Sequence, residues 1–407
     1  MQTFSPFSDM PEYAFPRLRK LLSNIKSVTD PIDMSIGEPK HPYPKFIEEI
    51  INNNLTGLNK YPPNDGYETF LESIGDWVKF RYEIPEFDHR NRVTILNGSR
   101  EGIFNSTLSL FPRLRGSKKK YIIIPNPFYQ CYLAACIAAN AQPIFVSSRA
   151  ENNFLPDYNE IPKNILDKTG IFFVCSPSNP YGSSASPEYW KGLISLSEKY
   201  NFRIFSDECY SEIYRKIKPV GLLSVVEKVG ADKEKISIFQ SLSKRSNLPG
   251  IRSGFSINGS TTTKILRKVR AYGGAPLPIP FQIASEKLWR DEKHVQLNRV
   301  KYNKKFALAK SIFQDPYNYE IPGAGFFMCL RVNNSERFTQ NLWAQTGVKV
   351  LPGSYLCNLE KLSDTEAAKI SSFVRIALVG SEKQIDDGLN RITNFLHSNA
   401  SFNLEQH

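Results

Sequence analysis

The residues best suited to chemistry in this chain follow short apolar runs, at the points where β-strands are expected to end. Asp207 is the last residue of such a run, and Asn179 and Lys244 follow others within three residues. Other candidates carry hydroxyl, phenol or guanidinium groups close to the ends of the same runs: Ser99, Arg100, Tyr129, Tyr210, Ser241 and Arg252. In open α/β sheets, ligands bind beyond the carboxyl ends of the strands, so we expect these side chains to share one crevice.

This set of groups suits an aromatic cofactor that carries a phosphate and a carbonyl group. A helix that begins near Ser99 would offer backbone N–H groups to the phosphate. Tyr129 could stack on the aromatic ring, and the amine of Lys244 could form an imine with the carbonyl carbon. The residues therefore predict pyridoxal 5′-phosphate as the cofactor.

The residues around Lys244 also match the motif of a different kind of enzyme. Ser241-Leu242-Ser243-Lys244 matches the S-x-x-K signature of penicillin-binding proteins and class A β-lactamases, in which the serine is acylated, and residues 168–170 supply a K-T-G. The order argues against this alternative, because K-T-G precedes S-x-x-K here and the sequence contains no S-D-N triplet.

The elements that must position these residues alternate between strand and helix. Continuous apolar runs, in place of alternating ones, are typical of parallel strands that are buried on both faces. Such runs lie at residues 92–96, 120–125, 142–147, 170–177, 202–207 and 235–241, with helical patterns at 100–111 and 186–201. We therefore predict an α/β fold with a mostly parallel central sheet that is covered by helices on both faces.

A Gly/Pro-rich break at residues 273–282 separates this pattern from a charged helical stretch and a second apolar section. We expect a large cofactor-binding domain over residues 46–285 and a small α/β domain over residues 286–407 that includes a connecting helix. The first thirty residues hold three prolines and lack an evident period. Residues 1–45 are therefore expected to form an arm and part of the small domain.

The motifs that carry these residues occur together, and in this order, in one known family. They read "NGSREG", "NPFYQCY", "FVCSPSNPYG", "SDECYSEIY", "SLSKRSNLPGIRSGF" and "VRIAL". From residue 35 to residue 379 the chain resembles the class I/II aminotransferases of fold-type I, which depend on pyridoxal phosphate. The resemblance implies a transferase that exchanges amino groups by ping-pong transamination.

The resemblance also implies a role for each residue. Lys244 would be the Schiff-base lysine and Asp207 would contact the pyridine nitrogen. Tyr210 and Asn179 would hydrogen-bond the phenolic oxygen of a ring that stacks on Tyr129. The implied phosphate ligands are Ser99, Arg100, Ser241 and Arg252, with Tyr61 reaching the site of the neighbouring subunit in a homodimer. The implied substrate contacts are Gly37, Asn179 and Arg375, of which Arg375 would bind a carboxylate.

Within the family, "SIGEPKHP" and "VLPGSYL" add a likeness to succinyldiaminopimelate aminotransferases. This likeness implies transfer between N-succinyl-LL-2,6-diaminopimelate and 2-oxoglutarate in lysine biosynthesis, with glutamate as a product. Specificity for aspartate, alanine or LL-diaminopimelate is the nearest alternative. Tyr181, Ser99 and Gly102 depart from the residues usual in the family or subgroup, and Lys40 and His41 are candidates for the far end of the substrate.

Composition limits the remaining function classes. The 407 residues are 41% hydrophobic and carry a formal net charge of +12, and no run of about eighteen apolar residues or secretory signal is evident. We expect a cytoplasmic protein that binds anionic small molecules and neither a membrane nor a nucleic acid. The six cysteines form no CxxC pair, so no metal site is expected. A non-catalytic DNA-binding regulator is disfavoured, because "SIGEP" at residue 35 leaves no room for a preceding winged helix.

Overall fold

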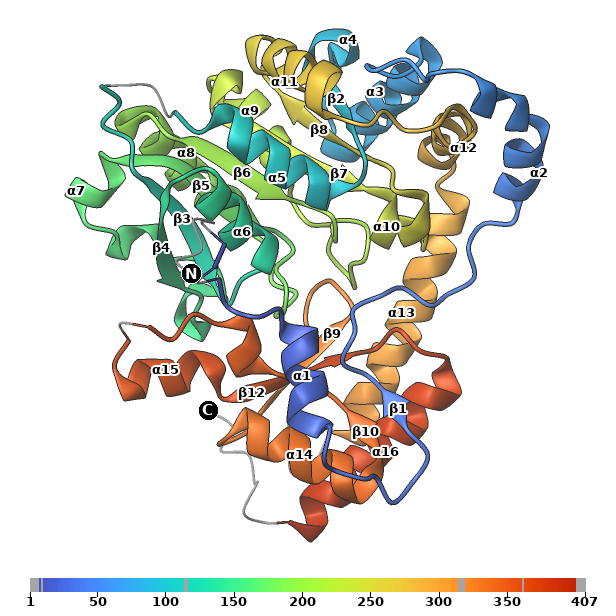
Figure 1. Ribbon diagram of the computed structural model, residues 1–407, viewed down its shortest axis with the longest axis vertical. Coiled ribbons are helices and arrows are strands. Elements are labelled where there is room, and N and C mark those ends of the chain that lie inside the picture. The colour runs from blue at the N-terminus through green and yellow to red at the C-terminus, as the bar shows by residue number, and fades with distance from the viewer. Residues whose placement is uncertain (1–6, 9, 113–115, 314–318, 361, 400–407) are drawn as a thin grey trace.

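The computed structural model describes residues 7–8, 10–112, 116–313, 319–360 and 362–399, so parts of the predicted arm and small domain lie outside the described residues. The predicted α/β class is confirmed, because a seven-stranded sheet with the order β2-β8-β7-β6-β5-β3-β4 forms the centre of the upper part of the molecule (Figure 1). Pairing from β7 through β4 is parallel, whereas β8 runs antiparallel to both of its neighbours. The strands are β2 (Val93–Leu96), β3 (Tyr121–Asn126), β4 (Gln142–Ser147), β5 (Thr169–Cys175), β6 (Arg203–Asp207), β7 (Ile236–Ser241) and β8 (Gly254–Asn258).

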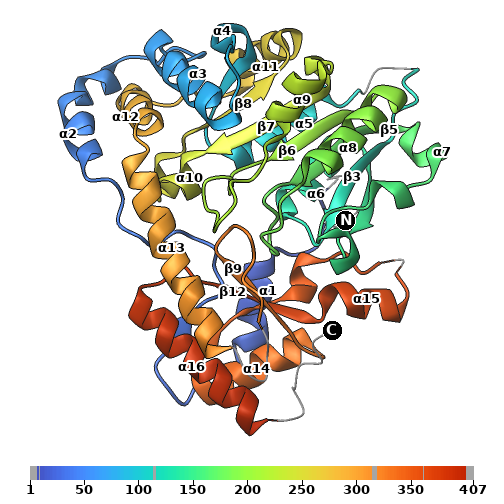
Figure 2. The ribbon, with the colours of Figure 1, turned by 180° about the vertical axis from the view of Figure 1, so that it is seen from behind.

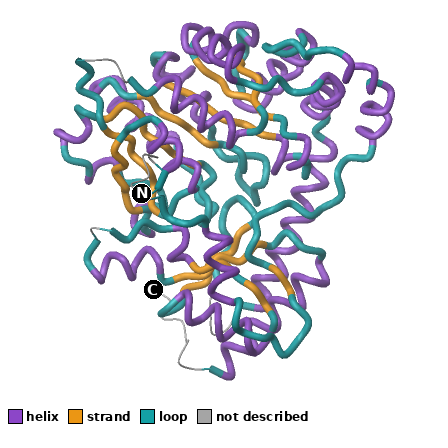
Figure 3. Tube along the Cα trace, in the orientation of Figure 1, coloured by secondary structure: helices purple, strands orange, loops and turns teal. Residues whose placement is uncertain are grey.

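Helices cover both faces of this sheet, so that the strands lie inside a helical shell (Figure 3). Successive residues of a strand point to opposite faces, and Ile122 and Ile123 accordingly belong to different hydrophobic cores. One core includes side chains of α3 (Glu68–Tyr82), α8 (Pro187–Tyr200), α9 (Leu222–Val229) and α12 (Ile279–Arg290). The other includes side chains of α5 (Ser99–Leu110), α6 (Gln130–Ala138) and α11 (Ser260–Gly273). Burial on both faces explains why the strands read as continuous apolar runs.

The lower part of the molecule contains two small sheets. In the first, β12 (Phe373–Ala377) lies antiparallel between β11 (Leu351–Pro352) and β9 (Phe327–Arg331). The second pairs β1 (Ile32–Asp33) in parallel with β10 (Val348–Lys349). Surrounding helices are α14 (Ser335–Thr346), α15 (Asp364–Ser371) and α16 (Glu382–Ser398). The long helix α13 (Lys293–Ile312) runs between the upper and lower parts, as the view from behind shows (Figure 2).

The remaining helices are short or lie near the N-terminus. They are α1 (Ala14–Leu22), α2 (Phe46–Asn53), α4 (His89–Arg92), α7 (Lys163–Leu166) and α10 (Leu242–Arg245). The expectation that the first thirty residues lack a helical period is wrong over α1. Ala14, Leu18 and Leu22 recur at intervals of four and are buried in a core with Leu351 and Tyr355. This helix brings the N-terminal segment to the site described below.

None of the helices among the described residues has both the length and the apolar character needed to cross a bilayer. No group of three or more His, Cys, Asp or Glu side chains among those residues could hold a metal ion.

Candidate active site

A cavity of about 530 Å³ opens beyond the carboxyl ends of β5, β6 and β7, where the upper and lower parts of the molecule meet. The predicted site residues that line it are Gly37, Ser99, Arg100, Tyr129, Asn179, Asp207, Tyr210, Ser241, Lys244, Arg252 and Arg375. Tyr61 does not line this cavity, and its side chain is fully exposed. The structure thus brings together every predicted site residue of this chain except the one expected to serve a neighbouring subunit.

Lys244 lies on α10, the single helical turn that follows β7. The hydroxyl of Ser241 caps this turn by accepting the N–H of Ser243 at 3.2 Å. The Lys244 amine donates a hydrogen bond of 2.6 Å to the carbonyl oxygen of Gly37. Burial lowers the pKa of the Lys244 amine to about 8, against an ordinary value of 10.5, because the charged form loses its hydration.

The K-T-G triplet of the acylation alternative lies far from Ser241 along the direction of the strands. Thr169 is the first residue of β5, whereas Ser241 is the last residue of β7, and both strands run parallel to β6. Residues 168–170 and Ser241 therefore lie at opposite ends of the strands. The two motifs of the acylation alternative do not share a site.

Asp207 ends β6 and is only 4% exposed. Tyr132 donates a hydrogen bond of 2.9 Å to the Oδ2 atom of Asp207, and the backbone N–H of Cys209 donates one of 3.3 Å to Oδ1. Burial raises the pKa of this carboxyl group. None of the ion pairs found among the described residues involves Asp207. A buried carboxyl group beside a cavity and without a direct ion pair suits a ligand that carries an N–H⁺ group.

The predicted phosphate ligands surround the first turn of α5. Ser99 is the first residue of that helix, and Gly98 before it has a φ of +84°. The Arg252 guanidinium donates to the carbonyl oxygens of Pro249 at 2.8 Å and Asn97 at 3.0 Å. A Cβ atom at Gly98 would collide with this guanidinium, so only glycine permits the approach. A helix N-terminus next to an arginine fits an anion.

The aromatic residues form one wall of the cavity. Tyr129 packs edge-on against Tyr132, with ring centroids 5.6 Å apart, and its hydroxyl oxygen accepts a hydrogen bond from Arg100 Nε. The ring of Tyr210 lies 5.3 Å from that of Phe326, and burial raises the pKa of the Tyr210 hydroxyl well above its ordinary value. The faces of these rings offer flat apolar surface to a ligand, and the tyrosine hydroxyl groups offer polar atoms at the ring edges.

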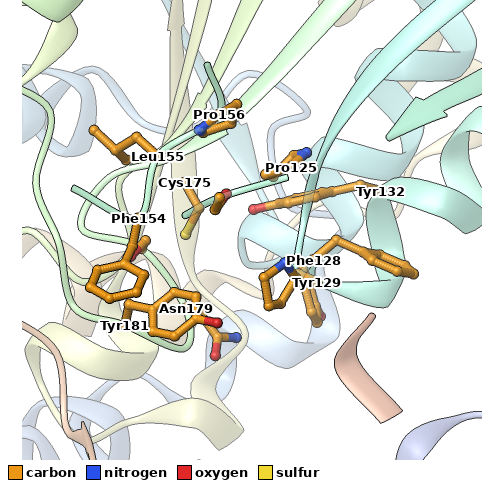
Figure 4. Close-up of a pocket in the computed structure, with 13 residues that line it drawn as sticks. Pro125, Phe128, Tyr129, Tyr132, Phe154, Leu155, Pro156, Cys175, Asn179 and Tyr181 are labelled. Atoms are coloured by element: carbon orange, nitrogen blue, oxygen red, sulfur yellow. The ribbon is translucent and has the colours of Figure 1, made fainter. Parts of the chain in front are cut away.

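A second, much smaller cavity adjoins this wall and has room for about one water molecule (Figure 4). Tyr181, which departs from the usual family residue, lies beside it and stacks on Phe154 at 4.3 Å. Its other neighbour is Phe373 on β12, at 5.4 Å. The tyrosine therefore fills space between the turn that carries Asn179 and the small sheet.

Arg375 lies on β12 and is 4% exposed. It donates to Oδ1 of Asn179 at 3.1 Å and to the carbonyl oxygen of Ser35 at 3.0 Å, while its Nε atom has no partner. The ring of Phe327 lies 4.1 Å from the guanidinium carbon, and burial lowers the pKa of Arg375 to about 10. A buried guanidinium that contacts only neutral acceptors is suited to receive a carboxylate.

The structure also shows the surroundings of Gly102 and of the two candidates for the far end of the substrate, Lys40 and His41. A Cβ atom at Gly102 would collide with Leu96, so this departure from the subgroup allows close packing of α5 on β2. Lys40 and His41 do not line the main cavity, and both ring nitrogens of His41 contact other protein groups.

Sequence reasoning also missed residues that the structure brings to the site. Tyr132 contacts Asp207, and its spacing of three residues from Tyr129 is a signal that could have identified it. Tyr13 and Phe15 also line the cavity, but nothing in the surrounding sequence distinguishes them.

The donor set fits pyridoxal phosphate at each of its functional groups. The start of α5 and Arg252 suit the phosphate, Asp207 suits the ring nitrogen, and the amine of Lys244 suits the aldehyde carbon. Because Oδ1 of Asn179 already accepts from Arg375, its NH₂ group is left to donate into the cavity.

Comparison with known proteins points to the same kind of enzyme. The family described as aminotransferase class I and II matches residues 29–392. LL-diaminopimelate aminotransferase of Halothermothrix orenii is 28% identical over 97% of this chain and 98% of its own length. The crystal structure of an aminotransferase from Neisseria meningitidis superposes with a TM-score of 0.91 at 34% identity, covering 96% of this chain and 99% of that one. A probable N-succinyldiaminopimelate aminotransferase structure from Thermus thermophilus has a TM-score of 0.80 over 94% of this chain and all of that one, but at 20% identity it shows the fold alone.

The match to the family extends over most of the chain and includes every strand of the central sheet. The structures of this family share the fold-type I architecture and depend on pyridoxal phosphate, which is therefore the cofactor here. The chain belongs to the class I and II aminotransferases and is a pyridoxal-phosphate-dependent enzyme that transfers amino groups.

Proposed function

We propose that this enzyme transfers an amino group from a diaminopimelate donor to 2-oxoglutarate in the biosynthesis of lysine, with LL-diaminopimelate as the preferred donor. The N-succinyl derivative expected from the sequence motifs is the second candidate. The relative from H. orenii, which is named for LL-diaminopimelate and matches nearly the full chain, supports the first form.

In the proposed mechanism, the chemistry that bound pyridoxal phosphate supplies is an electron sink for the α-carbon of the amino acid. The Lys244 amine would remove the proton from that carbon, and its pKa of about 8 leaves on the order of a tenth of the amine neutral at pH 7, far more than for an ordinary lysine. Asp207 would hold a proton on the ring nitrogen. Tyr210 and Asn179 would donate hydrogen bonds to the phenolic oxygen, and Arg375 would orient the α-carboxylate of the substrate.

The observation that carries the choice of donor is a pair of opposite charges in the cavity wall. Glu38 and Arg100 both line the cavity and both have exposed side chains. Arg100 was expected at the phosphate, and we assign it instead to the far end of the donor. The far end of LL-diaminopimelate carries a carboxylate and an ammonium group, which complement an arginine and a glutamate. In the N-succinyl derivative that amine is a neutral amide and a further carboxylate is present, so Glu38 would face only negative charge.

A donor panel with two variants tests this assignment. We expect kcat/KM for LL-diaminopimelate to exceed the values for aspartate and alanine by at least about tenfold, the gain from one hydrogen bond to a charged group. Glu38→Gln should lower kcat/KM for LL-diaminopimelate while sparing the N-succinyl donor, and Arg100→Ala should impair both donors more than alanine. Initial rates of glutamate formation measure each value. A wild-type preference for the N-succinyl donor that Glu38→Gln leaves unchanged would contradict the proposal.

We also propose that the enzyme is a homodimer with shared active sites. Tyr61 has a fully exposed side chain and does not line the cavity of its own chain. A two-fold dimer would allow it to reach the phosphate in the other subunit. All six cysteines are free, which is typical of the reducing cytoplasm that we propose as the compartment.

Tyr61→Phe should weaken cofactor binding by about tenfold, because one hydrogen bond to a charged phosphate is lost. Fluorescence titration of the cofactor-free protein with pyridoxal phosphate measures this change. A mixed dimer of Tyr61→Phe and Lys244→Ala subunits provides the control. If sites are shared, one of its two sites combines both changes and the other is wild type, so half of the sites should regain wild-type affinity. Equal affinity of Tyr61→Phe and wild type would refute a shared phosphate site.

A further inference from the structure

Lys305, on the connecting helix α13, is a buried cation with unusual partners. Lys305 is only 1% exposed. The ammonium contacts Nε2 of His41 at 2.6 Å and the carbonyl oxygen of Val379 at 3.3 Å, and both are neutral acceptors. Among the ion pairs of the described residues, none involves Lys305. Burial of an ammonium without a direct ion pair is costly, and it lowers the pKa of Lys305 to about 8 although the charge of Glu382 acts in the opposite direction.

His41 connects this ammonium to the backbone of the proposed catalytic lysine. Its Nδ1 atom lies 2.7 Å from Oδ1 of Asn298. The NH₂ group of Asn298 in turn donates to the carbonyl oxygens of Lys244 at 3.4 Å and Arg245 at 3.3 Å. Asn298, which is itself on α13, therefore joins this helix to α10, and His41 bridges Asn298 and Lys305 on the same helix.

One assignment of protons satisfies this whole chain of contacts. If Lys305 donates to Nε2, then His41 is neutral and carries its hydrogen on Nδ1, from which it donates to Asn298. A protonated His41 would instead direct an N–H at the ammonium. Burial accordingly lowers the pKa of His41 to about 4, and the charges of Lys305 and Lys301 act in the same direction. The ring is thus held in one tautomer and one orientation.

The same segment reaches Lys244 by a second path. Gly37, four residues before His41, accepts the hydrogen bond from the Lys244 amine. The His41 ring also packs 4.4 Å from Tyr302, which stacks on Phe326 at 5.5 Å. Phe326 in turn lies 5.3 Å from the Lys244 amine. Residues 37–41 therefore contact both the amine and the backbone surroundings of Lys244, and Lys305 anchors the far end of this segment.

We propose that Lys305, His41 and Asn298 are positioning residues for amino transfer, which hold residues 37–41 and the Lys244 backbone in their working arrangement. None of the three lines the main cavity, so they act through Gly37 and Lys244 without touching the substrate. The inference rests on the proposed role of Lys244. It gives a reason for a lysine at a buried position, where its ammonium carries a desolvation cost.

The test compares Lys305→Met, which removes the ammonium and keeps an unbranched stem, with Lys304→Met at an exposed position of the same helix. Loss of positioning should lower kcat by about 10- to 100-fold, as small misplacements of reacting groups do. KM should change far less. Thermal stability should change little, because the removal of a buried charge offsets the loss of its hydrogen bonds to His41 and Val379. Lys305→Arg, which keeps a donor, should recover part of kcat.

Hydrogen exchange of the cofactor-free protein gives an independent readout. Amides of residues 36–43 should exchange faster in Lys305→Met than in wild type, while the central sheet should not change. His41→Phe, which keeps a ring against Tyr302 but removes both nitrogens, should act in the same direction and serves as a second variant if Lys305→Met does not fold. Wild-type kcat together with unchanged exchange would overturn the proposal. If the proposed donor is wrong, the donor panel with the wild-type enzyme will show it. The hydrogen-exchange comparison needs no donor, so it would still test the role of Lys305.

Discussion

Lys244→Ala is expected to reduce amino transfer by at least about 10⁴-fold, the upper end of what a positioned acid–base group contributes. The variant lacks both the amine that would bind the cofactor and the base that would move the substrate proton. No other lysine lines the main cavity, as far as the described residues show, so no second amine is available. Glutamate formation from 2-oxoglutarate, measured with saturating donor and cofactor, gives the rate.

The fold should tolerate this change, because the amine donates a hydrogen bond to Gly37 but carries a desolvation cost in the cavity wall. Equal thermal midpoints for variant and wild type would separate lost chemistry from lost structure. Lys216→Ala, at an exposed position, is the matched control and should keep full activity. A rate within tenfold of wild type for Lys244→Ala would contradict the proposed mechanism.

Arg375→Leu should lower kcat/KM by about 10²- to 10³-fold, because it removes one partner of a buried hydrogen-bonded charge pair. The loss should be similar for every amino donor and for 2-oxoglutarate, since each carries a carboxylate next to the reacting carbon. Arg375→Lys should remain strongly impaired, because an ammonium cannot reproduce the planar fork that contacts both Asn179 and Ser35.

Arg331→Leu supplies the control for this prediction. Arg331 ends the neighbouring strand β9 and has an exposed side chain, so its loss should leave kcat/KM within about twofold, as surface substitutions usually have small effects. Steady-state kinetics with several donors measures both variants. A defect of Arg375→Leu that is confined to one donor would mean that this arginine recognises a side chain and not the shared carboxylate.

Much of the large sheet could be predicted because the physics that forms it is local. Strands buried on both faces must be apolar throughout, and the observed strand bounds lie within about two residues of the predicted runs. Polar residues at the carboxyl ends of such strands have few structural reasons to be there. Asp207 and Lys244 could therefore be proposed as site residues before their surroundings were known.

Contacts between distant segments left no such signal. Gly37 is 207 positions from Lys244, and Arg375 is 196 positions from Asn179, so the short sequence windows that reveal helices and strands cannot pair them. Lys305 is one of 52 lysines and arginines, and only its burial distinguishes it. Tyr13 and Phe15 reach the cavity through the packing of α1 on the small sheet, which depends on the complete fold.

The most direct test of the account is to locate the covalent attachment of the cofactor. Borohydride reduction of the holoenzyme, followed by digestion and mass spectrometry, fixes the cofactor to the lysine that holds it. We expect the added mass on the peptide that contains Lys244, and we expect it to disappear in Lys244→Ala. Attachment to any other lysine, or an unmodified Lys244 peptide in active enzyme, would contradict the central claim.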